Sequence, residues 1–377
     1  MEVYLDYNAT TPVDKRVLLE MLPYFSDYFG NAHSHTHHYG KKALHAVESS
    51  RQKVADFFGC RPDEVYFTSG STESLNLLLK GLFSSSREKG NHIVTSKAEH
   101  KVVLDICDYL ESFCGAKITR LDVDYEGNIN LSELENSITE KTIFAALMMA
   151  NHETGLVSPI EKISEIVHAK GALLLSDTTQ AAGKLSVKVE ALGIDAACVS
   201  AHKIYGPKGV GAVYIRGKNS SVNVLPLLQG GGHENGIRSG TLNVPGIVGL
   251  GKACEIAEQE RWEDNARISS LRGYFEHQLL EIPGVRINGG TRDRLYNTSN
   301  MCFAGKKATD IVSKLDRIAI SLGSACSSAL LQPSSVLSAM GFSQEEVESS
   351  IRFSFGKYTT REETEYVVTK LLDILRG

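Results

Sequence analysis

The chain has 377 residues, of which 42% are hydrophobic and 23% charged, an ordinary globular composition long enough for two domains. A net charge of -5 gives no electrostatic basis for direct binding of nucleic acid. The seven cysteines form no CxxC pair, which argues against a disulfide framework and a zinc site, so we expect no metal and a reducing, cytoplasmic compartment.

The N-terminal part begins with a short extended segment, residues 1–13, which lacks the basic and apolar regions of a signal peptide. Helical patterns follow at about 13–24 and 41–58, and no apolar run in the chain reaches membrane-spanning length. The loop between the two helices contains four histidines: His33, His35, His37 and His38. Their spacing does not fit one helix face and no acidic or cysteine partner is near, so we interpret the loop as the polar edge of a cleft rather than a metal site.

A predicted strand at residues 64–67 runs directly into the small-residue turn 68–74, TSGSTES, and an apolar helical pattern begins at Leu75. The free N–H groups and the dipole of a helix N-terminus make such a turn an anion site, to which Ser71 and Thr72 can add hydroxyl donors. Turns of this kind also occur as simple helix caps, so the pattern alone leaves both interpretations open.

Four further apolar runs, at residues 92–96, 143–149, 172–175 and 196–199, also end in polar side chains. In chain order these side chains are His100, then Asn151 and His152, then Asp177 and Gln180, then Ser200, His202 and Lys203. Helical patterns separate most of the runs, and the carboxyl ends of parallel strands meet at one edge of an open sheet. We therefore predict a doubly wound α/β domain whose ligand site lies at that edge.

Lys203 is the candidate for covalent chemistry. It lies beside His202 at a strand end, and a lysine amine can form a Schiff base with a carbonyl cofactor such as pyridoxal phosphate (PLP). Taken alone, Lys203 can equally be a solvated surface lysine, and His100 a helix cap. Asp177 directly follows a buried strand, where a carboxylate is costly unless it meets a cation or a strong donor.

The second half of the chain begins with a glycine-rich loop, residues 229–241, which is either a ligand contact or a flexible connection. Arg238 and Thr241 in this loop are natural donors to phosphate or carboxylate. A long helix is predicted at about 247–276, and the composition then changes. We predict a large domain over residues 14–257 and a small α+β domain formed by residues 1–13 and 258–377.

Two residues of the small domain stand out chemically. Cys326 lies among Gly, Ser and Ala, the composition of an exposed loop, and is the candidate for a reactive thiol. Arg352 lies in a β-like run, SIRFS, where its planar, bidentate donor suits the carboxylate of a substrate.

Eight motifs follow one another along the chain: LDYNATTP, TSGSTES, KAEH, SDTTQ, SAHKIYGPKG, GGGHENGIRSGT, GSACSS and SIRFSFG. Together they resemble the cysteine desulfurases, PLP-dependent enzymes of fold type I related to the class V aminotransferases. The resemblance covers essentially the whole chain. The GSACSS loop is more similar to the NifS/IscS-like group, to which DndA-like enzymes belong, than to the SufS-like group.

The resemblance implies how a cofactor would be held. Lys203 would bind PLP covalently, Asp177 would pair with the ring nitrogen, and His100 would stack on the ring and help to move protons. Gln180 and either His152 or Asn151 would contact the ring oxygen. The phosphate would be held by Ser71, Thr72, Ser200 and His202, and Thr241 would reach the phosphate of the neighbouring subunit in a homodimer.

The resemblance also implies the reaction, conversion of L-cysteine to alanine. Arg352 would bind the substrate carboxylate, Lys203 would take the Cα proton, and Cys326 would receive the sulfur as a persulfide. The acceptor would be a protein of iron–sulfur assembly, tRNA thiolation or DNA phosphorothioation. Alternatives are a selenocysteine lyase, an aminotransferase, and a non-enzymatic sulfur carrier on an inactive PLP fold.

The chain departs from the family pattern at several points. His152 stands where most relatives have Asn, Ala32 stands where relatives commonly have Pro, and three histidines of the 33–38 loop are additional to the usual His37. The sequence ends at Gly377, without the extension through which IscS-like enzymes bind the iron–sulfur scaffold. We therefore do not expect that scaffold as the default acceptor.

Overall fold

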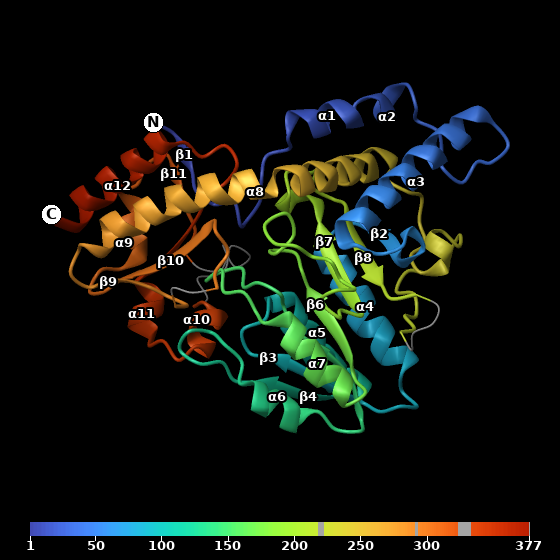
Figure 1. The fold of residues 1–377 in the computed structure, drawn as a ribbon, viewed down its shortest axis with the longest axis horizontal. Helices are drawn as coiled ribbons and strands as arrows, with labels where there is room; N and C mark the ends of the chain where they lie inside the picture. Colours follow the sequence, from blue (N-terminus) through green and yellow to red (C-terminus); the bar gives the residue numbers. More distant parts are fainter. Residues whose placement is uncertain (218–221, 291–292, 323–332, 377) are drawn as a thin grey trace.

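The computed structural model describes residues 1–217, 222–290, 293–322 and 333–376, and its centre is a mainly parallel sheet (Figure 1). Within these residues the sheet has seven strands in the order β2-β8-β7-β6-β5-β3-β4. They are β2 (Val65–Thr68), β3 (His92–Ser96), β4 (Lys117–Leu121), β5 (Thr142–Ala146), β6 (Leu173–Asp177), β7 (Ala196–Ser200) and β8 (Gly211–Ile215). β8 is antiparallel to both neighbours and the other pairs are parallel, so the carboxyl ends of β2, β3, β5, β6 and β7 meet at one edge.

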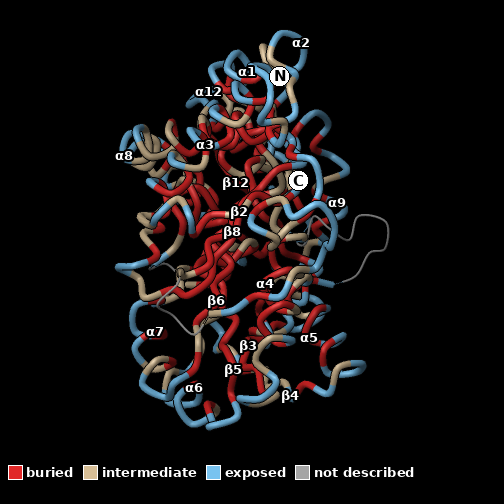
Figure 2. The backbone as a smooth tube through the Cα atoms, turned by 90° about the vertical axis from the view of Figure 1, so that its right-hand side faces the viewer, coloured by how far each residue is buried: buried red, intermediate tan, exposed pale blue. Residues whose placement is uncertain are grey.

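Helices cover both faces of this sheet, which explains why its central strands read as continuous apolar runs. On one face, side chains such as Phe144 and Cys198 pack under α4 (Ser71–Ser85) and α5 (Lys101–Cys114). Their chain neighbours, such as Ala145 and Val199, point to the other face, because side chains alternate along a strand. That face is covered by α3 (His38–Phe58), α6 (Leu131–Ser137), α7 (Ile160–Ala169) and the first half of α8 (Val244–Leu280). Figure 2 shows these strands as the buried centre of the molecule.

The smaller part of the molecule has its own core. β10 (Thr298–Phe303) pairs antiparallel with β9 (Val285–Ile287) and β12 (Ser350–Ser354). The N-terminal β1 (Val3–Tyr4) pairs with β11 (Ile318–Ala319), and Val3 and Leu5 belong to the same core. The short and C-terminal helices of this part are α9 (Ala308–Ser313), α10 (Ser335–Ala339), α11 (Gln344–Glu348) and α12 (Arg361–Arg376).

α8 joins the two parts (Figure 1). Its buried residues up to Ile256 belong to the core of the large part, whereas those from Ile268 onward belong to the core of the small part. The helix therefore passes from the core of the large part to the core of the small part between Ile256 and Ile268. The domain boundary at residue 257 stays a prediction. The remaining described elements are α1 (Lys15–Met21), α2 (Pro23–Ser26) and the 3-10 turns η1 (Pro62–Glu64), η2 (Ala201–Lys203) and η3 (Glu234–Gly236).

The α/β fold with a mainly parallel sheet is confirmed, but the edge strand β4 was not predicted from the sequence. Its residues KITRL are mostly polar and only partly buried, because an edge strand has a single neighbour. No helix in the described part of the chain has both the length and the apolar character needed to cross a membrane.

Candidate active site

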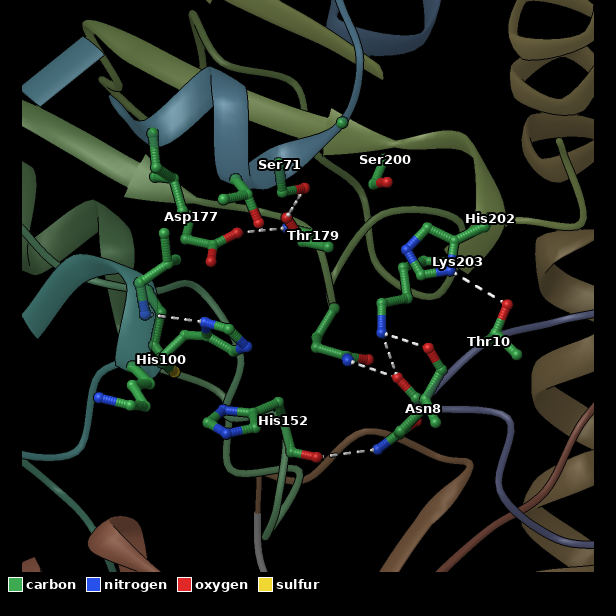
Figure 3. A pocket seen from close by; sticks show the side chains of 18 of the residues that line it. Asn8, Thr10, Ser71, His100, His152, Asp177, Thr179, Ser200, His202 and Lys203 are labelled. Carbon is green, nitrogen blue, oxygen red and sulfur yellow. Dashed lines mark hydrogen bonds between the residues drawn. The ribbon is translucent and has the colours of Figure 1, made fainter. Parts of the chain in front are cut away.

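A cleft of about 730 Å³ lies at the carboxyl edge of the large sheet. Its lining combines strand ends of the large part with residues of the small part and of the N-terminal segment (Figure 3). Ten residues predicted from the sequence line it: Ser71, Thr72, His100, His152, Asp177, Gln180, Ser200, His202, Lys203 and Arg352.

One end of the cleft is formed by the N-terminus of α4. Gly70, the N-cap residue, has φ +142°, a conformation that favours glycine, and the helix has no side-chain cap. A Cβ on Gly211 would lie 2.8 Å from the Cα of Gly70, so the turn and β8 pack too closely for side chains. Ser71 Oγ lies 2.6 Å from Thr179 Oγ1 beside this turn. The uncapped helix start with hydroxyl groups around it favours an anion site over a simple cap.

His202 lies near the same end and is neutral. Burial, followed by the charges of Lys203 and Lys208, lowers the pKa of His202 to about 4. Its Nδ1 lies 3.1 Å from the hydroxyl of Thr10. When that hydroxyl donates to Nδ1, the imidazole proton is on Nε2, which is then a neutral donor suited to a phosphate oxygen.

Asp177 ends β6 and is 9% exposed. Its Oδ1 accepts hydrogen bonds from two neutral donors, the N–H of Thr179 at 2.9 Å and the thiol of Cys198 at 3.5 Å. A buried carboxylate with neutral donors gains from a cation placed against it. The carboxylate is directed toward the space between His100 and Lys203 (Figure 3), where a protonated ring nitrogen would fit.

Lys203 ends the 3-10 turn that follows β7, and its amine crosses to the N-terminal segment. Nζ donates to the carbonyl oxygens of Asn8, at 2.5 Å, and Ala9, at 2.8 Å. The turn is held to the same segment by the N–H of Thr11, which donates to the carbonyl of His202 at 2.9 Å. Lys203 is thus a cleft lysine with specific acceptors, not a solvated surface lysine.

His100 and His152 lie against each other, with ring centroids 4.9 Å apart. His100 is also the N-cap of α5, because its Nδ1 accepts from the N–H of Val102 at 3.2 Å. The same residue therefore caps a helix and lines the cleft. Burial, then the charges of His100, Arg352 and Lys203, lowers the pKa of His152 well below its usual value. His152 is therefore a neutral imidazole.

Three buried polar atoms of cleft residues have no hydrogen-bond partner: Oε1 of Gln180, Nδ1 of His152 and Nε of Arg352. Gln180 is 6% exposed, and its Nε2 donates to the carbonyl of Asn8 at 3.0 Å. Leaving such atoms unpaired is costly, so they fit a ligand that brings polar atoms of its own.

Arg352 is almost fully buried in β12 and already has two partners. Its Nη2 donates to Asp6 Oδ1 at 2.7 Å and its Nη1 to the carbonyl of His152 at 2.9 Å. Its Nε is buried without a partner. The guanidinium is thus fixed in orientation at the cleft, with donor capacity remaining for a carboxylate.

Three predicted site residues are not among those that line the cleft. The side chain of Asn151 is buried and bonds to its own loop, donating to Ala98 O at 3.1 Å and accepting from the N–H groups of Glu153 and Thr154. Thr241 is exposed. Cys326 lies outside the described residues, although Pro333 and Ser335, which follow its segment, line the cleft.

The histidine loop and the glycine-rich loop have other contacts. His37 caps α3 by accepting from the N–H of Gly40, and the ring of His33 lies 4.0 Å from that of His233. Arg238 pairs with Glu73 on α4 at 2.7 Å. None of the four loop histidines lines the cleft. The described residues contain no group of three or more His, Cys, Asp or Glu arranged to hold a metal ion.

Asn8, Ala9 and Thr10 all line the cleft, although none of them was predicted from the sequence as a site residue. They belong to the LDYNATTP motif, whose small polar residues follow a strand as those of the other motifs do. Their position just after a strand could have identified them as site residues.

The cleft fits PLP at each of its polar groups: an anion site for the phosphate, a buried carboxylate for the ring nitrogen and a lysine for the aldehyde. The family model for class V aminotransferases matches residues 3–367. The chain belongs to this family of PLP-dependent enzymes.

Comparisons with individual proteins show which group of this family the chain belongs to. The chain is 46% identical over 375 residues to the cysteine desulfurase IscS of Anaeromyxobacter sp. (strain Fw109-5), covering 99% of this chain and 92% of the relative. It is similar to a solved NifS-like protein with a TM-score of 0.93, 38% identity and full coverage of both chains. A structure of SspA in complex with cysteine has a TM-score of 0.83 and 36% identity, covering 96% of this chain and 100% of that one. The protein is a PLP-dependent cysteine desulfurase.

Proposed function

We propose that this enzyme transfers the sulfur of L-cysteine to Cys326, with Lys203 both as the residue that binds the cofactor and as the base that takes the Cα proton. The observation that carries the proposal is the convergence of Lys203, Asp177 and the N-terminus of α4 on one cleft. PLP, when bound, supplies an electron sink that stabilises negative charge at the substrate Cα. The structure of SspA in complex with cysteine supports the same substrate here.

Each remaining role uses an observed contact. Arg352 binds the substrate carboxylate, and Asp6 and the carbonyl of His152 hold the guanidinium in orientation. His100 offers its ring to the cofactor while its Nδ1 is occupied by the α5 cap. Of His152 and Asn151, we propose that His152 contacts the ring oxygen, because Asn151 is fully engaged with its loop.

The sulfur transfer itself belongs to Cys326. Its thiolate attacks the substrate sulfur, so that an S–S bond forms and the Cβ–S bond breaks. The electron pair of the broken bond stays with the alanine fragment, which takes up a proton and leaves as alanine. Cys326 then carries a persulfide for an acceptor protein. We also propose a homodimer in which the exposed Thr241 reaches the phosphate of the other subunit's cofactor.

Two substitutions test this proposal, with alanine and sulfide measured under a reductant. Lys203→Ala should abolish both alanine formation and the visible absorbance of the bound cofactor, whereas Lys188→Ala, at a lysine outside the cleft, should not. Cys326→Ser should keep the cofactor absorbance and lose sulfur transfer, while Cys60→Ser retains it. An aminotransferase would be indifferent to Cys326, and a higher rate on selenocysteine than on cysteine would indicate a lyase.

A further inference from the structure

Asn8 is fully buried in the N-terminal segment, and hydrogen bonds to the small part of the molecule occupy its side chain. Its Nδ2 donates to Thr298 Oγ1 at 2.9 Å and to the carbonyl of His152 at 3.3 Å. Its Oδ1 accepts from Asn297 Nδ2 at 3.0 Å. Its N–H donates to Ser354 Oγ at 2.9 Å. The side chain and the N–H are thus fixed mainly by residues in and next to β10 and β12, with one further bond to His152 of the large part.

The carbonyl of Asn8 points the other way, into the cleft. It accepts from Lys203 Nζ at 2.5 Å and from Gln180 Nε2 at 3.0 Å, so both lone pairs of the oxygen are used by cleft residues. Ala9 supplies a second carbonyl to Lys203 at 2.8 Å. Asn8 therefore connects the small part to the lysine and the glutamine of the site.

A pair of carbonyl acceptors stabilises an ammonium more than a neutral amine, because hydrogen bonds from charged donors are the stronger ones. Among the other titratable groups around Lys203, the Asp177 carboxylate, which lines the same cleft, also favours an ammonium, whereas a charged Lys184 disfavours one. Burial, followed by the charge of Lys203, lowers the pKa of Lys184 to about 7, and His202 and His152 are neutral. The carbonyls of Asn8 and Ala9 accept directly from the amine and so favour a protonated Lys203.

We propose that Asn8 is a positioning residue of the desulfurase reaction. Its side chain fixes the two carbonyl oxygens that hold the Lys203 ammonium after that amine has accepted the Cα proton. The proton moves from the substrate Cα to Nζ, and the ammonium then donates to Asn8 O and Ala9 O. This inference rests on the proposed role of Lys203 as the base.

The test compares Asn8→Ala with Asn288→Ala, which removes an equally buried asparagine. Asn288 bonds to Asn300 and Ser350 in the small part and does not line the cleft. In the full chain stripped of PLP, an amine-selective reagent at fixed pH should modify Lys203 about tenfold faster in Asn8→Ala, measured by peptide mass spectrometry. In the holoenzyme, kcat should fall about tenfold, with KM within threefold. Asn288→Ala should match the wild type in both assays.

A less disruptive variant, Thr298→Val, tests the inference if Asn8→Ala does not fold. Thr298→Val removes one of the two acceptors of Asn8 Nδ2 and leaves the asparagine in place, so it should shift Lys203 reactivity in the same direction by a smaller factor. Equal Lys203 reactivity in the Asn8, Thr298 and Asn288 variants would overturn the inference and leave the proposed function intact. Full turnover by Lys203→Ala would instead overturn the proposed function itself.

Discussion

The two walls of the cleft are built from different parts of the chain and contribute different chemistry. The strand-end wall consists of four residues that offer their side chains: Ser71, His100 and Lys203, which follow β2, β3 and β7, and Asp177, which ends β6. The N-terminal wall consists of Asn8, Ala9 and Thr10, and the first two offer backbone carbonyls to Lys203. Asp6, just before this wall, offers its carboxylate to Arg352. The first wall rests on one rigid sheet, whereas the second is held by contacts to the small part.

This difference predicts two kinds of variant. Substitutions in the strand-end wall remove chemical groups and should lower kcat with little effect on the rest of the fold. Substitutions at the N-terminal wall break hydrogen bonds between the two parts, so they should change the placement of Lys203 and Arg352 as well as stability.

Asp177→Asn, in the strand-end wall, should have the largest effect. It removes the negative charge that we place against the cofactor ring nitrogen, and loss of one such preorganised group typically lowers kcat about a hundredfold. The measurement is kcat for alanine formation from cysteine with saturating PLP.

The control for Asp177 is Asp195→Asn. Asp195 is also buried and precedes β7 at the amino edge of the sheet, where it pairs with His168 and Arg216. Its substitution should reduce stability and leave kcat within about twofold. An equal loss of kcat in both variants would show that Asp177 acts through the fold rather than the cofactor.

The contrast between the walls also explains what could be predicted from the sequence. Asp177, Ser200 and Lys203 were predicted because each stands at or just after the end of an apolar run, and parallel strands carry their ends to one edge. The same reasoning found His100 and Ser71. The side-chain type and the local pattern together were sufficient for the strand-end wall.

The N-terminal wall could not be predicted in this way. Asn8 and Ala9 act through carbonyl groups, which every residue has, and their partners Lys203 and Gln180 lie more than 170 residues away in the chain. Likewise, no local pattern shows that Asn151 turns its amide into its own loop while the adjacent His152 faces the cleft. These contacts depend on how the two parts pack.

The second prediction concerns Glu99, a buried carboxyl that directly precedes His100 of the strand-end wall. It is 2% exposed and accepts from the N–H of Met148 and the hydroxyl of Ser96. Burial, with a smaller contribution from the charge of Asp177, raises the pKa of Glu99 to about 8. Folded Glu99 therefore stays protonated between pH 4.5 and 8, where the unfolded carboxyl ionises, so its contribution to stability falls as pH rises through this window.

Glu99→Gln should remove this pH dependence, because an amide keeps the acceptor oxygen and does not ionise. Between pH 5 and pH 7 the free energy of unfolding of the wild type should lose about 2 kcal/mol relative to the variant. Urea unfolding at the two pH values measures it. Parallel pH dependences of the two proteins would mean that folded Glu99 ionises normally.

The third prediction tests the N-terminal wall through Arg352. Arg352→Lys replaces a bidentate fork by a point charge, so KM for cysteine should rise about tenfold while kcat changes less than threefold. Asp6→Asn, which weakens the orientation of the guanidinium, should raise KM by a smaller factor. Arg294→Lys is the control, since Arg294 is equally buried and pairs with Glu276 away from the cleft. An equal rise of KM in Arg294→Lys would mean that a disturbance of the whole small part, and not the loss of the Arg352 guanidinium, weakens cysteine binding.

The smallest expected effect is at Asp14, just after the N-terminal wall. Its backbone N–H donates to the carbonyl of Tyr205, and its carboxylate caps α1 and pairs with Arg16. The hydrogen bonds from Arg16, followed by the charges of Arg16 and Lys357, lower the pKa of Asp14 to about 2 against the opposing effect of burial. A lowered carboxyl pKa stabilises the fold above the unfolded value of 3.8, and this contribution is lost as the pH falls toward 2.

Asp14→Asn keeps the cap and loses the charge, so it should cost about 1 kcal/mol at pH 6, and the difference from the wild type should shrink between pH 4.5 and pH 2.5. Asp122→Asn, at an exposed pair with Lys97, is the matched control and should change stability by less than about 0.5 kcal/mol at any pH. Chemical unfolding across this pH range measures both. A cost at Asp14 that does not change with pH would show that the charge of the carboxylate is not what stabilises this end of the segment.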